Sequence, residues 1–212
     1  GKTATMMALL DIVNQEQKDH IVTVEDPIEY LLPSQNCNVN QRHVEVHTES
    51  YASALRSAMR SDPDYICVSE MRDLDTVAMA ITAAETGHLV FGTLHTTNAV
   101  RSIDRMVDVF PPKEQEQIRA MVSESIRGVI SQQLLPREDG MGREPVLEIM
   151  FSTPAVANMI RERKTFQLQS VLQTGSKQGM CTMDDSILGW QKKKIMSREN
   201  AWFFSENKDS FK

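Results

Sequence analysis

Cysteine pairs are missing from this sequence. Its three cysteines, Cys37, Cys67 and Cys181, lie far apart along the chain and include no C-x-x-C pair. An odd, scattered set of this kind argues against a disulfide framework and excludes a cysteine-rich zinc site. This cysteine usage predicts a reduced, cytoplasmic protein.

Long apolar runs and an excess of basic charge are also missing. No hydrophobic stretch approaches the roughly 20 residues that a helix needs to cross a bilayer, and nothing resembles a secretory signal peptide. The net charge of −6 is spread along the chain, which argues against a broad nucleic-acid-binding surface. The 212 residues are 41% hydrophobic and 25% charged, as in a globular protein with one large domain or two modest ones.

Short apolar segments alternate with helical segments in the first half of the chain. The apolar segments, which predict buried strands, lie in "HIVTVEDPIEY" (residues 20–30), "YICVSEMRD" (residues 65–73) and "HLVFGTLHTT" (residues 88–97). The predicted helices lie near residues 1–13, 50–62 and 74–87. This alternation predicts a parallel α/β sheet. Residues 37–46 carry a weaker strand pattern that predicts a hairpin.

Strand signals fade after Pro111. Residues 113–135 predict one long helix, and residues 137–151 predict a short hairpin or loop. Three further helices are predicted near residues 153–163, 166–174 and 182–195. We therefore expect an α/β part over residues 1–111 and a mostly helical part over residues 112–212.

Ionisable residues follow each of the three predicted strands. The first strand ends in Glu25 and Asp26, the second in Glu70, and the third in His95. The carboxyl ends of parallel strands meet at one edge of a sheet, where ligands bind. Neighbouring strand residues point to opposite faces, so only one of Glu25 and Asp26 is expected to aim into the site.

Gly1, Lys2 and Thr3 begin the first predicted helix. The N-terminus of a helix attracts phosphate through its free N–H groups and the helix dipole. In a phosphate-binding loop the lysine reaches the β- and γ-phosphates and the threonine hydroxyl ligates Mg²⁺. Three common residues in a chance order remain the alternative explanation.

Residues 65–73, "YICVSEMRD", have the form of a Walker B strand, in which Glu70 would hold Mg²⁺ through water. Glu25 would polarise the attacking water. A shared metal site at His88 and His95 is rejected, because seven residues of extended strand span roughly 23 Å. His95 lies at the carboxyl end of its strand, where it would sense the phosphates, and His88 lies at the other end.

Three stretches closely resemble the Asp-box, Walker B and His-box motifs of the secretion and type IV pilus ATPases. They are "VEDPIEY", "VSEMRDLDT" and "TAAETGHLVFGTLHTTNAVRSIDRMVDVFP". The resemblance covers essentially the whole chain, most strongly residues 20–136, and implies a RecA-like P-loop ATPase core followed by a mostly helical region. It also implies that "GKT" is the end of a Walker A loop whose glycines and preceding strand are cut away.

Within that superfamily the chain looks like a PilT-type retraction ATPase. The extension and type II secretion branches usually carry a four-cysteine zinc motif, which three scattered cysteines cannot supply. Residues 155–162, "AVANMIRE", are similar to the "AIRNLIRE" motif of the retraction branch, with Ala157 in place of an arginine.

The resemblance implies a role for each matching residue. ATP phosphates would be bound by Gly1, Lys2 and Thr3, and Mg²⁺ by Thr3 and by Glu70 through water. The catalytic residues would be Glu25, which orients water, Glu70, and His95, which together with His88 would belong to the His-box that couples nucleotide state to ring geometry.

The resemblance further implies a homohexameric ring, each site completed by arginines of a neighbour. Arg42, Arg56 and Arg60 are candidates for phosphate contacts. The expected partners are the inner-membrane pilus platform protein and a paralogous retraction ATPase, with the ring peripheral to the inner membrane. Because the loop glycines and first strands are expected to be missing, we expect this chain alone to bind ATP poorly and to hydrolyse it negligibly.

Other functions stay open at this point. They are an accessory or type II secretion-type traffic ATPase, a DNA-translocating ring ATPase, which the negative charge disfavours, and a regulatory paralogue that does not hydrolyse ATP. Near the end of the chain, Trp202, Phe203 and Phe204 either pack on the helical part or form a docking patch.

Overall fold

The computed structural model describes residues 1–211, which form two compact units. The first, here called the sheet unit, contains residues 2–95 and 109–114. The second, here called the hairpin unit, contains residue 1, residues 96–108 and the described residues from Gln115 on.

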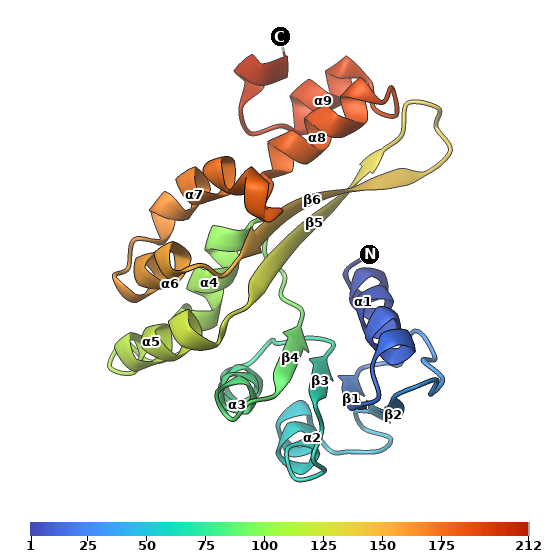
Figure 1. Ribbon diagram of the computed structural model, residues 1–212, viewed down its shortest axis with the longest axis vertical. Coiled ribbons are helices and arrows are strands. Elements are labelled where there is room, and N and C mark those ends of the chain that lie inside the picture. The colour runs from blue at the N-terminus through green and yellow to red at the C-terminus, as the bar shows by residue number, and fades with distance from the viewer. Residues whose placement is uncertain (212) are drawn as a thin grey trace. The chain divides into compact units, whose positions relative to one another are not determined.

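The sheet unit is built on a four-stranded parallel sheet in the order β2-β1-β3-β4 (Figure 1). The strands are β1 (His20–Glu25), β2 (Asn38–His43), β3 (Tyr65–Val68) and β4 (Leu89–Gly92). The central strands β1 and β3 are buried on both faces, as their continuous apolar sequences predict. The predicted parallel α/β sheet is therefore present.

Helices cover both faces of this sheet. They are α1 (Lys2–Glu16) on one face, and α2 (Tyr51–Ala58) and α3 (Leu74–Glu85) on the other. Ser50 caps α2 by accepting from the backbone N–H of Ser53, and Asp73 caps α3 in the same way with Thr76. Gly87, at a φ of 103°, allows the chain to leave α3 and enter β4.

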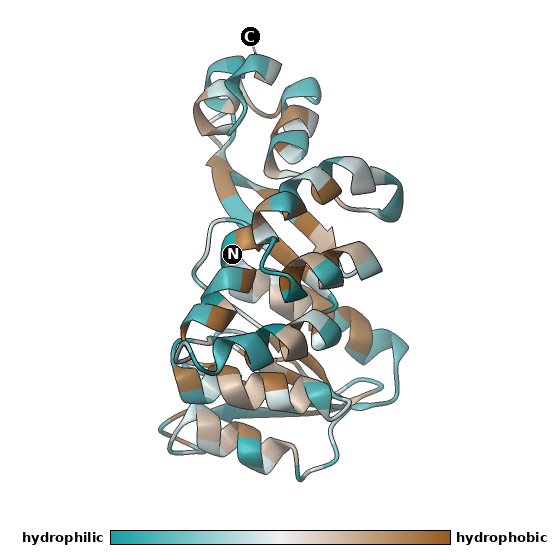
Figure 2. Ribbon diagram, turned by 90° about the vertical axis from the view of Figure 1, so that its left-hand side faces the viewer, coloured by the Kyte–Doolittle hydropathy of each residue, from teal (hydrophilic) through white to brown (hydrophobic). Residues whose placement is uncertain are grey.

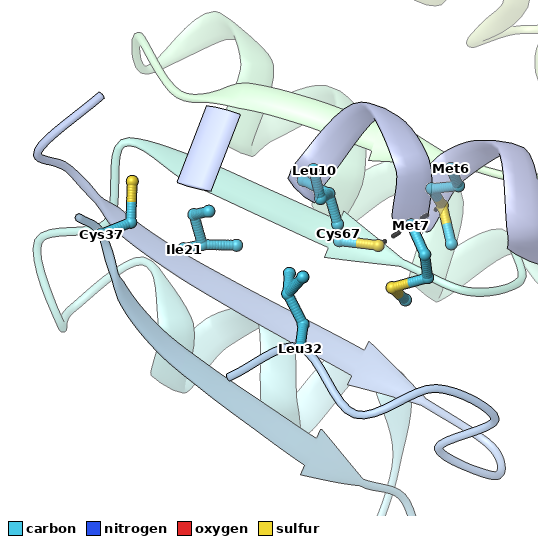
Figure 3. Packing of buried hydrophobic residues seen from close by; sticks show 7 residues of the cluster. All are labelled: Met6, Met7, Leu10, Ile21, Leu32, Cys37 and Cys67. Carbon is cyan, nitrogen blue, oxygen red and sulfur yellow. Dashed lines mark hydrogen bonds between the residues drawn. The ribbon is translucent and has the colours of Figure 1, made fainter. Parts of the chain in front are cut away.

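The α1 face of the sheet is packed with apolar and sulfur-containing side chains (Figure 3). Leu10 is fully buried against the sheet, and the Cys67 thiol lies 3.3 Å from the Met6 sulfur. Burial raises the pKa of Cys67 well above its usual range, so the thiol stays protonated and packs as an apolar group.

The hairpin unit is built around a long antiparallel pair, β5 (Gly128–Pro136) and β6 (Arg143–Phe151). Its helices are α4 (Ala99–Asp108), α5 (Gln115–Ser125), α6 (Pro154–Arg161), α7 (Leu168–Thr174), α8 (Met183–Lys192) and α9 (Arg198–Phe204). Short 3-10 turns, η1 (Thr165–Gln167), η2 (Gly175–Gln178) and η3 (Lys208–Phe211), lie between or after them.

A buried glutamate joins three elements of the hairpin unit. Glu148 on β6 is 2% exposed, and its carboxylate accepts from the first backbone N–H groups of α4 and α8, at Ala99 and Met183. Burial raises the pKa of Glu148, and these hydrogen bonds oppose the rise. One carboxylate thus satisfies the orphan donors of two helix N-termini.

The single helix predicted over residues 113–135 is wrong. The structure ends α5 at Ser125 and begins β5 at Gly128. Val129 and Ile130 favour a strand, and pairing with β6 over all nine residues of β5 supplies the hydrogen bonds that a helix would have made internally. Pairing between distant segments overrode a helical pattern. The hairpin or loop predicted over residues 137–151 is the turn and the second strand of this longer hairpin.

The hairpin predicted over residues 37–46 is also wrong. Residues 38–43 form β2, which runs parallel to β1 from the pair His20–Asn38 to the pair Glu25–His43. A parallel partner needs a crossover connection of about a dozen residues, and residues 26–37 provide one.

The remaining predicted helices are present, including those near residues 153–163, 166–174 and 182–195. In the tail, Phe204 packs on the core of the hairpin unit, whereas Phe203 is 67% exposed.

Among the described residues, no helix is long and apolar enough to cross a membrane, and Figure 2 shows apolar and polar residues mixed along the helices.

Replacing Leu10 by Ala is expected to lower the free energy of unfolding by about 2–5 kcal/mol, because it opens a cavity under α1. The matched control is Ile12→Ala on the same helix, where the side chain is 52% exposed and the expected change is about 0.5 kcal/mol or less. Urea unfolding of both variants measures the difference. Equal losses would show that α1 does not pack as described.

Candidate functional site

A chain of polar contacts joins the start of α1 to the ends of β3 and β4. The Lys2 ammonium lies 3.4 Å from Nδ1 of His95, and Nε2 of His95 lies 2.8 Å from Oε1 of Glu70. The same Glu70 oxygen pairs with Nε of Arg72. Three of the residues predicted to act together are therefore linked in space.

The backbone around Glu70 is held by its neighbours on both sides. Ser69 N–H donates to Val24 O at 2.9 Å, and Met71 N–H donates to Thr93 O at 3.0 Å. The Ser69 hydroxyl lies 2.8 Å from the hydroxyl of Tyr51 on α2. Glu70 thus lies on a segment held in place by hydrogen bonds to β1 on one side and to the end of β4 on the other.

The ionisation of Glu70 is set by its partners. The hydrogen bond from Arg72 lowers the pKa of Glu70, and the charges of Arg72 and His95 act in the same direction. Burial opposes them, since the side chain is only 17% exposed. Glu70 is therefore held as a carboxylate, which is the form that can face a metal ion.

Glu25 is the second carboxylate of this edge, and it is fully buried. Its Oε1 accepts from the Thr23 hydroxyl at 2.6 Å and from the Gln41 amide at 2.9 Å. Its Oε2 has no hydrogen-bond partner among the described residues. Glu25 shares the α1 face of β1 with Ile21, whereas its neighbour Asp26 is exposed. Only Glu25 of the two points into the protein, as the alternation predicted.

The register of the sheet brings the two carboxylates to one edge. Val24 pairs with Val68, so Glu25 and Glu70 lie one and two residues beyond this pair on neighbouring strands. The first turn of α1 carries Lys2 and Thr3, and Gly1 precedes it as an exposed residue. The first four N–H groups of an α-helix have no partner inside the helix, so this end of α1 adds positive potential.

His88 lies away from these residues, at the start of β4. Its Nδ1 lies 2.9 Å from Ala83 O at the end of α3, which is a structural contact. A cavity of about 410 Å³ adjoins His88 at this opposite edge, and its lining includes Asp19, Asp62 and Asp64. Acidic groups of this kind repel phosphate, so the cavity does not fit the predicted nucleotide.

The three candidate arginines differ in their surroundings. Arg42 donates to Ala54 O and to the Ser61 hydroxyl, at 3.4 and 3.3 Å, and so lies along α2. Arg56 and Arg60 are exposed on α2 and just after it.

The sequence interpretation missed Thr23, Gln41 and Arg72. Two of them lie two residues from a predicted site carboxylate, Thr23 before Glu25 and Arg72 after Glu70. Residues two positions apart on a strand lie on the same face, so this spacing predicts that Thr23 lies beside Glu25 on β1. Arg72 lies beyond the end of β3, where the rule does not apply. Gln41 carried no local signal, because only the β1–β2 register brings it to Glu25.

Comparison with known proteins identifies the family. The model of the type II/IV secretion system protein family matches residues 1–183. The chain belongs to this family. The family assignment agrees with the motifs at the three strand ends.

Two similar proteins are named for pilus retraction and for twitching motility. A type IV pilus retraction ATPase, PilT of Pseudomonas aeruginosa, is 53% identical over 201 residues, which are 95% of this chain and 58% of that protein. A twitching motility protein of Neisseria gonorrhoeae is 50% identical over 210 residues, 99% of this chain and 56% of that protein.

A solved structure shows the same fold. The pilus retraction motor PilT with bound ADP has a TM-score of 0.90 and 44% identity, covering 99% of this chain and 59% of that one. The predicted α/β fold class and the resemblance to PilT-type ATPases are therefore confirmed. The chain spans less than two thirds of the length of each of these three proteins.

Replacing Arg72 by Ala is expected to raise the pKa of Glu70 toward its ordinary value, because the largest lowering influence is removed. A carboxyl with a lowered pKa in the fold stabilises it at neutral pH, and that contribution is lost as the pH falls through the folded pKa. NMR titration of the Glu70 carboxyl carbon in the isolated chain measures the shift. Exposed Arg60→Ala is the control, and an unchanged Glu70 pKa in Arg72→Ala would contradict the pairing.

Proposed function

We propose that this chain forms the catalytic part of an ATP-hydrolysing hexameric motor that drives type IV pilus retraction and twitching motility. The observation that carries the proposal is the strand edge where Lys2 and Glu70 are linked through His95, and where buried Glu25 keeps one carboxylate oxygen unpartnered among the described residues. Similarity to a type IV pilus retraction ATPase over 95% of the chain and to a twitching motility protein over 99% of the chain supports it.

The residues at this edge fit a nucleoside triphosphate with Mg²⁺. Lys2 and the N-terminus of α1 offer positive charge to phosphates, and Gly1 allows close approach of the backbone. The described residues contain no group of three or more His, Cys, Asp or Glu side chains that could hold a metal alone. Thr3 and Glu70, the latter through water, would therefore share Mg²⁺ with the phosphates. When bound, the ion neutralises charge on the phosphate oxygens.

Glu25 is assigned the role of orienting the attacking water and accepting its proton. Glu25 is fully buried, and its Oε2, which has no partner among the described residues, is the atom that we assign to accept the proton. His95 contacts both Lys2 and Glu70. We therefore assign His95 the role of coupling bound phosphate to β4, the strand that His95 follows. His88 has the structural role described above.

The assembly is proposed to be a homohexamer in the cytoplasm, peripheral to the inner membrane. Its partners are the pilus platform protein and a paralogous retraction ATPase, and nucleic acid is not among them. Exposed Arg56 and Arg60 are better placed than Arg42 to reach a neighbour's phosphates, because Arg42 is bound to α2 of its own chain.

We also propose the division of the chain made from its sequence. Residues 1–111 form the RecA-like ATPase core, beginning inside the Walker A motif, and residues 112–212 form the mostly helical C-terminal region of the motor domain. The chain spans 56–58% of the length of the two curated relatives, and we propose that this part alone hydrolyses ATP negligibly.

Two other functions are separated by experiment. An accessory or type II secretion-type traffic ATPase would hydrolyse ATP without restoring retraction to a strain that has lost it. A regulatory paralogue would form the ring without turnover. The presence of Lys2, Glu25 and Glu70 favours an active enzyme over such a paralogue.

The first test is ATP hydrolysis by a form extended to the length of the relatives, with and without Mg²⁺. Lys2→Ala is expected to abolish turnover while light scattering still shows a hexamer, because exposed Lys2 supplies the phosphate contact and touches His95 but lies outside the buried core. Lys18→Ala, an exposed lysine two residues after the end of α1, is the matched control. The isolated chain should hydrolyse ATP negligibly, and no turnover by a well-formed extended hexamer would favour the regulatory paralogue.

Glu25→Gln is expected to lower kcat by about 100-fold or more, because an amide cannot accept the proton of water. Nucleotide binding should persist, since Glu25 is not assigned a phosphate contact. The measurement pairs steady-state turnover with binding of a fluorescent ATP analogue in the extended form. Unchanged turnover in Glu25→Gln would remove Glu25 from the catalytic set.

A further inference from the structure

Two neutral side chains hold one oxygen of Glu25 and leave the other without a partner. Thr23 Oγ1 and Gln41 Nε2 both donate to Oε1, at 2.6 and 2.9 Å. Oε2 is buried and has no hydrogen-bond partner among the described residues. A buried carboxylate oxygen without a donor costs free energy, so this asymmetry calls for a functional reason.

The β1–β2 register produces this arrangement. Thr23 pairs with Gln41 across the two parallel strands, and Glu25 lies two residues after Thr23 on the same face. Both donors therefore approach the carboxylate from the strand side. A shift of β2 by one residue would turn Gln41 to the opposite face and remove its contact.

The orientation of the Gln41 amide is determined by its other contacts. Its Oε1 accepts from the backbone N–H of Leu32 at 2.8 Å, and its Nε2 also donates to Tyr30 O at 2.9 Å. A backbone N–H can only donate and a carbonyl oxygen can only accept. Leu32 and Tyr30 thus fix which end of the amide faces Glu25, and that end is the donor.

We infer that Thr23 and Gln41 are positioning residues for Glu25, an inference that rests on the proposed function. By donating together to Oε1 they fix the carboxylate and leave Oε2 to receive the water proton. Neither residue touches substrate in this arrangement. Gln41 also links the backbone of Tyr30 and Leu32 to the carboxylate. The Thr23 hydroxyl contacts the carboxylate but neither Tyr30 nor Leu32.

The test uses shape-matched variants in the extended form. Gln41→Leu and Thr23→Val each remove one donor to Glu25, and kcat is expected to fall about 10- to 100-fold, as it does when partners that orient catalytic ligands are lost. The KM for ATP and the affinity for a fluorescent ADP analogue should stay within about two-fold, because phosphate contacts are untouched. Thr23→Ser keeps the hydroxyl and should restore most of the lost kcat.

Gln15→Leu is the matched control, because the Gln15 side chain donates to Asp11 on the same helix, its one hydrogen bond within residues 1–211, and lies outside the site. Thermal unfolding of each variant separates positioning from stability. A fall in kcat with the melting temperature unchanged, reversed in Thr23→Ser, supports the inference. A kcat that stays near wild type in both Gln41→Leu and Thr23→Val overturns it while leaving the proposed ATPase intact.

Two more outcomes overturn the inference. If kcat falls only in step with a lower melting temperature, and Thr23→Ser does not restore it, the two residues are structural. If the wild-type extended form has no turnover, the proposed function fails and the inference fails with it. NMR of the Gln41 side-chain amide in the isolated chain checks the geometry separately, since Glu25→Leu should shift that signal and Asp26→Leu should not.

Discussion

The parallel hydrogen-bonded register of β1 with β2 and β3 is the constraint on which the site depends. It places Glu25 and Glu70 one and two residues beyond the pair Val24–Val68, and it brings Gln41 across from Thr23. Both faces of β1 and β3 are buried by helices, so a slip of one residue would move each side chain to the opposite face and disrupt the packing on both. The packing that stabilises the sheet therefore also fixes the geometry of its edge.

The two carboxylates of this edge differ in the groups that hold them, and the roles proposed for them differ accordingly. Glu70 is partly exposed and paired with Arg72 and His95, and the hydrogen bond from Arg72 lowers its pKa. Glu25 is buried and bonded only to the neutral donors Thr23 and Gln41 at one oxygen. These neutral donors fix the position of the Glu25 carboxylate and leave its second oxygen without a partner among the described residues.

A buried carboxylate also organises the hairpin unit, for a different purpose. Both described N–H partners of Glu148 are helix N-termini, at Ala99 and Met183, and its role is to join α4 and α8 to β6. Glu148 is 2% exposed, and its carboxylate accepts from the backbone of both helices. Burial of an acid is thus not itself a sign of catalysis in this protein. What distinguishes Glu25 is the oxygen that no described residue satisfies.

Local patterns in the sequence are enough to predict part of this structure. The strands at "HIVTVE" and "YICV" and the site residues at the strand ends follow from apolar runs and from the rule for parallel sheets. Contacts made in the folded chain set the rest: residues 128–136 form a strand, β2 runs parallel to β1, and Gln41 and Arg72 reach the carboxylates. These features depend on pairing between segments distant in the chain or on the direction of one side chain. Neither leaves a periodic pattern in the sequence, because the stabilising contacts are made by partners that the local residues do not specify.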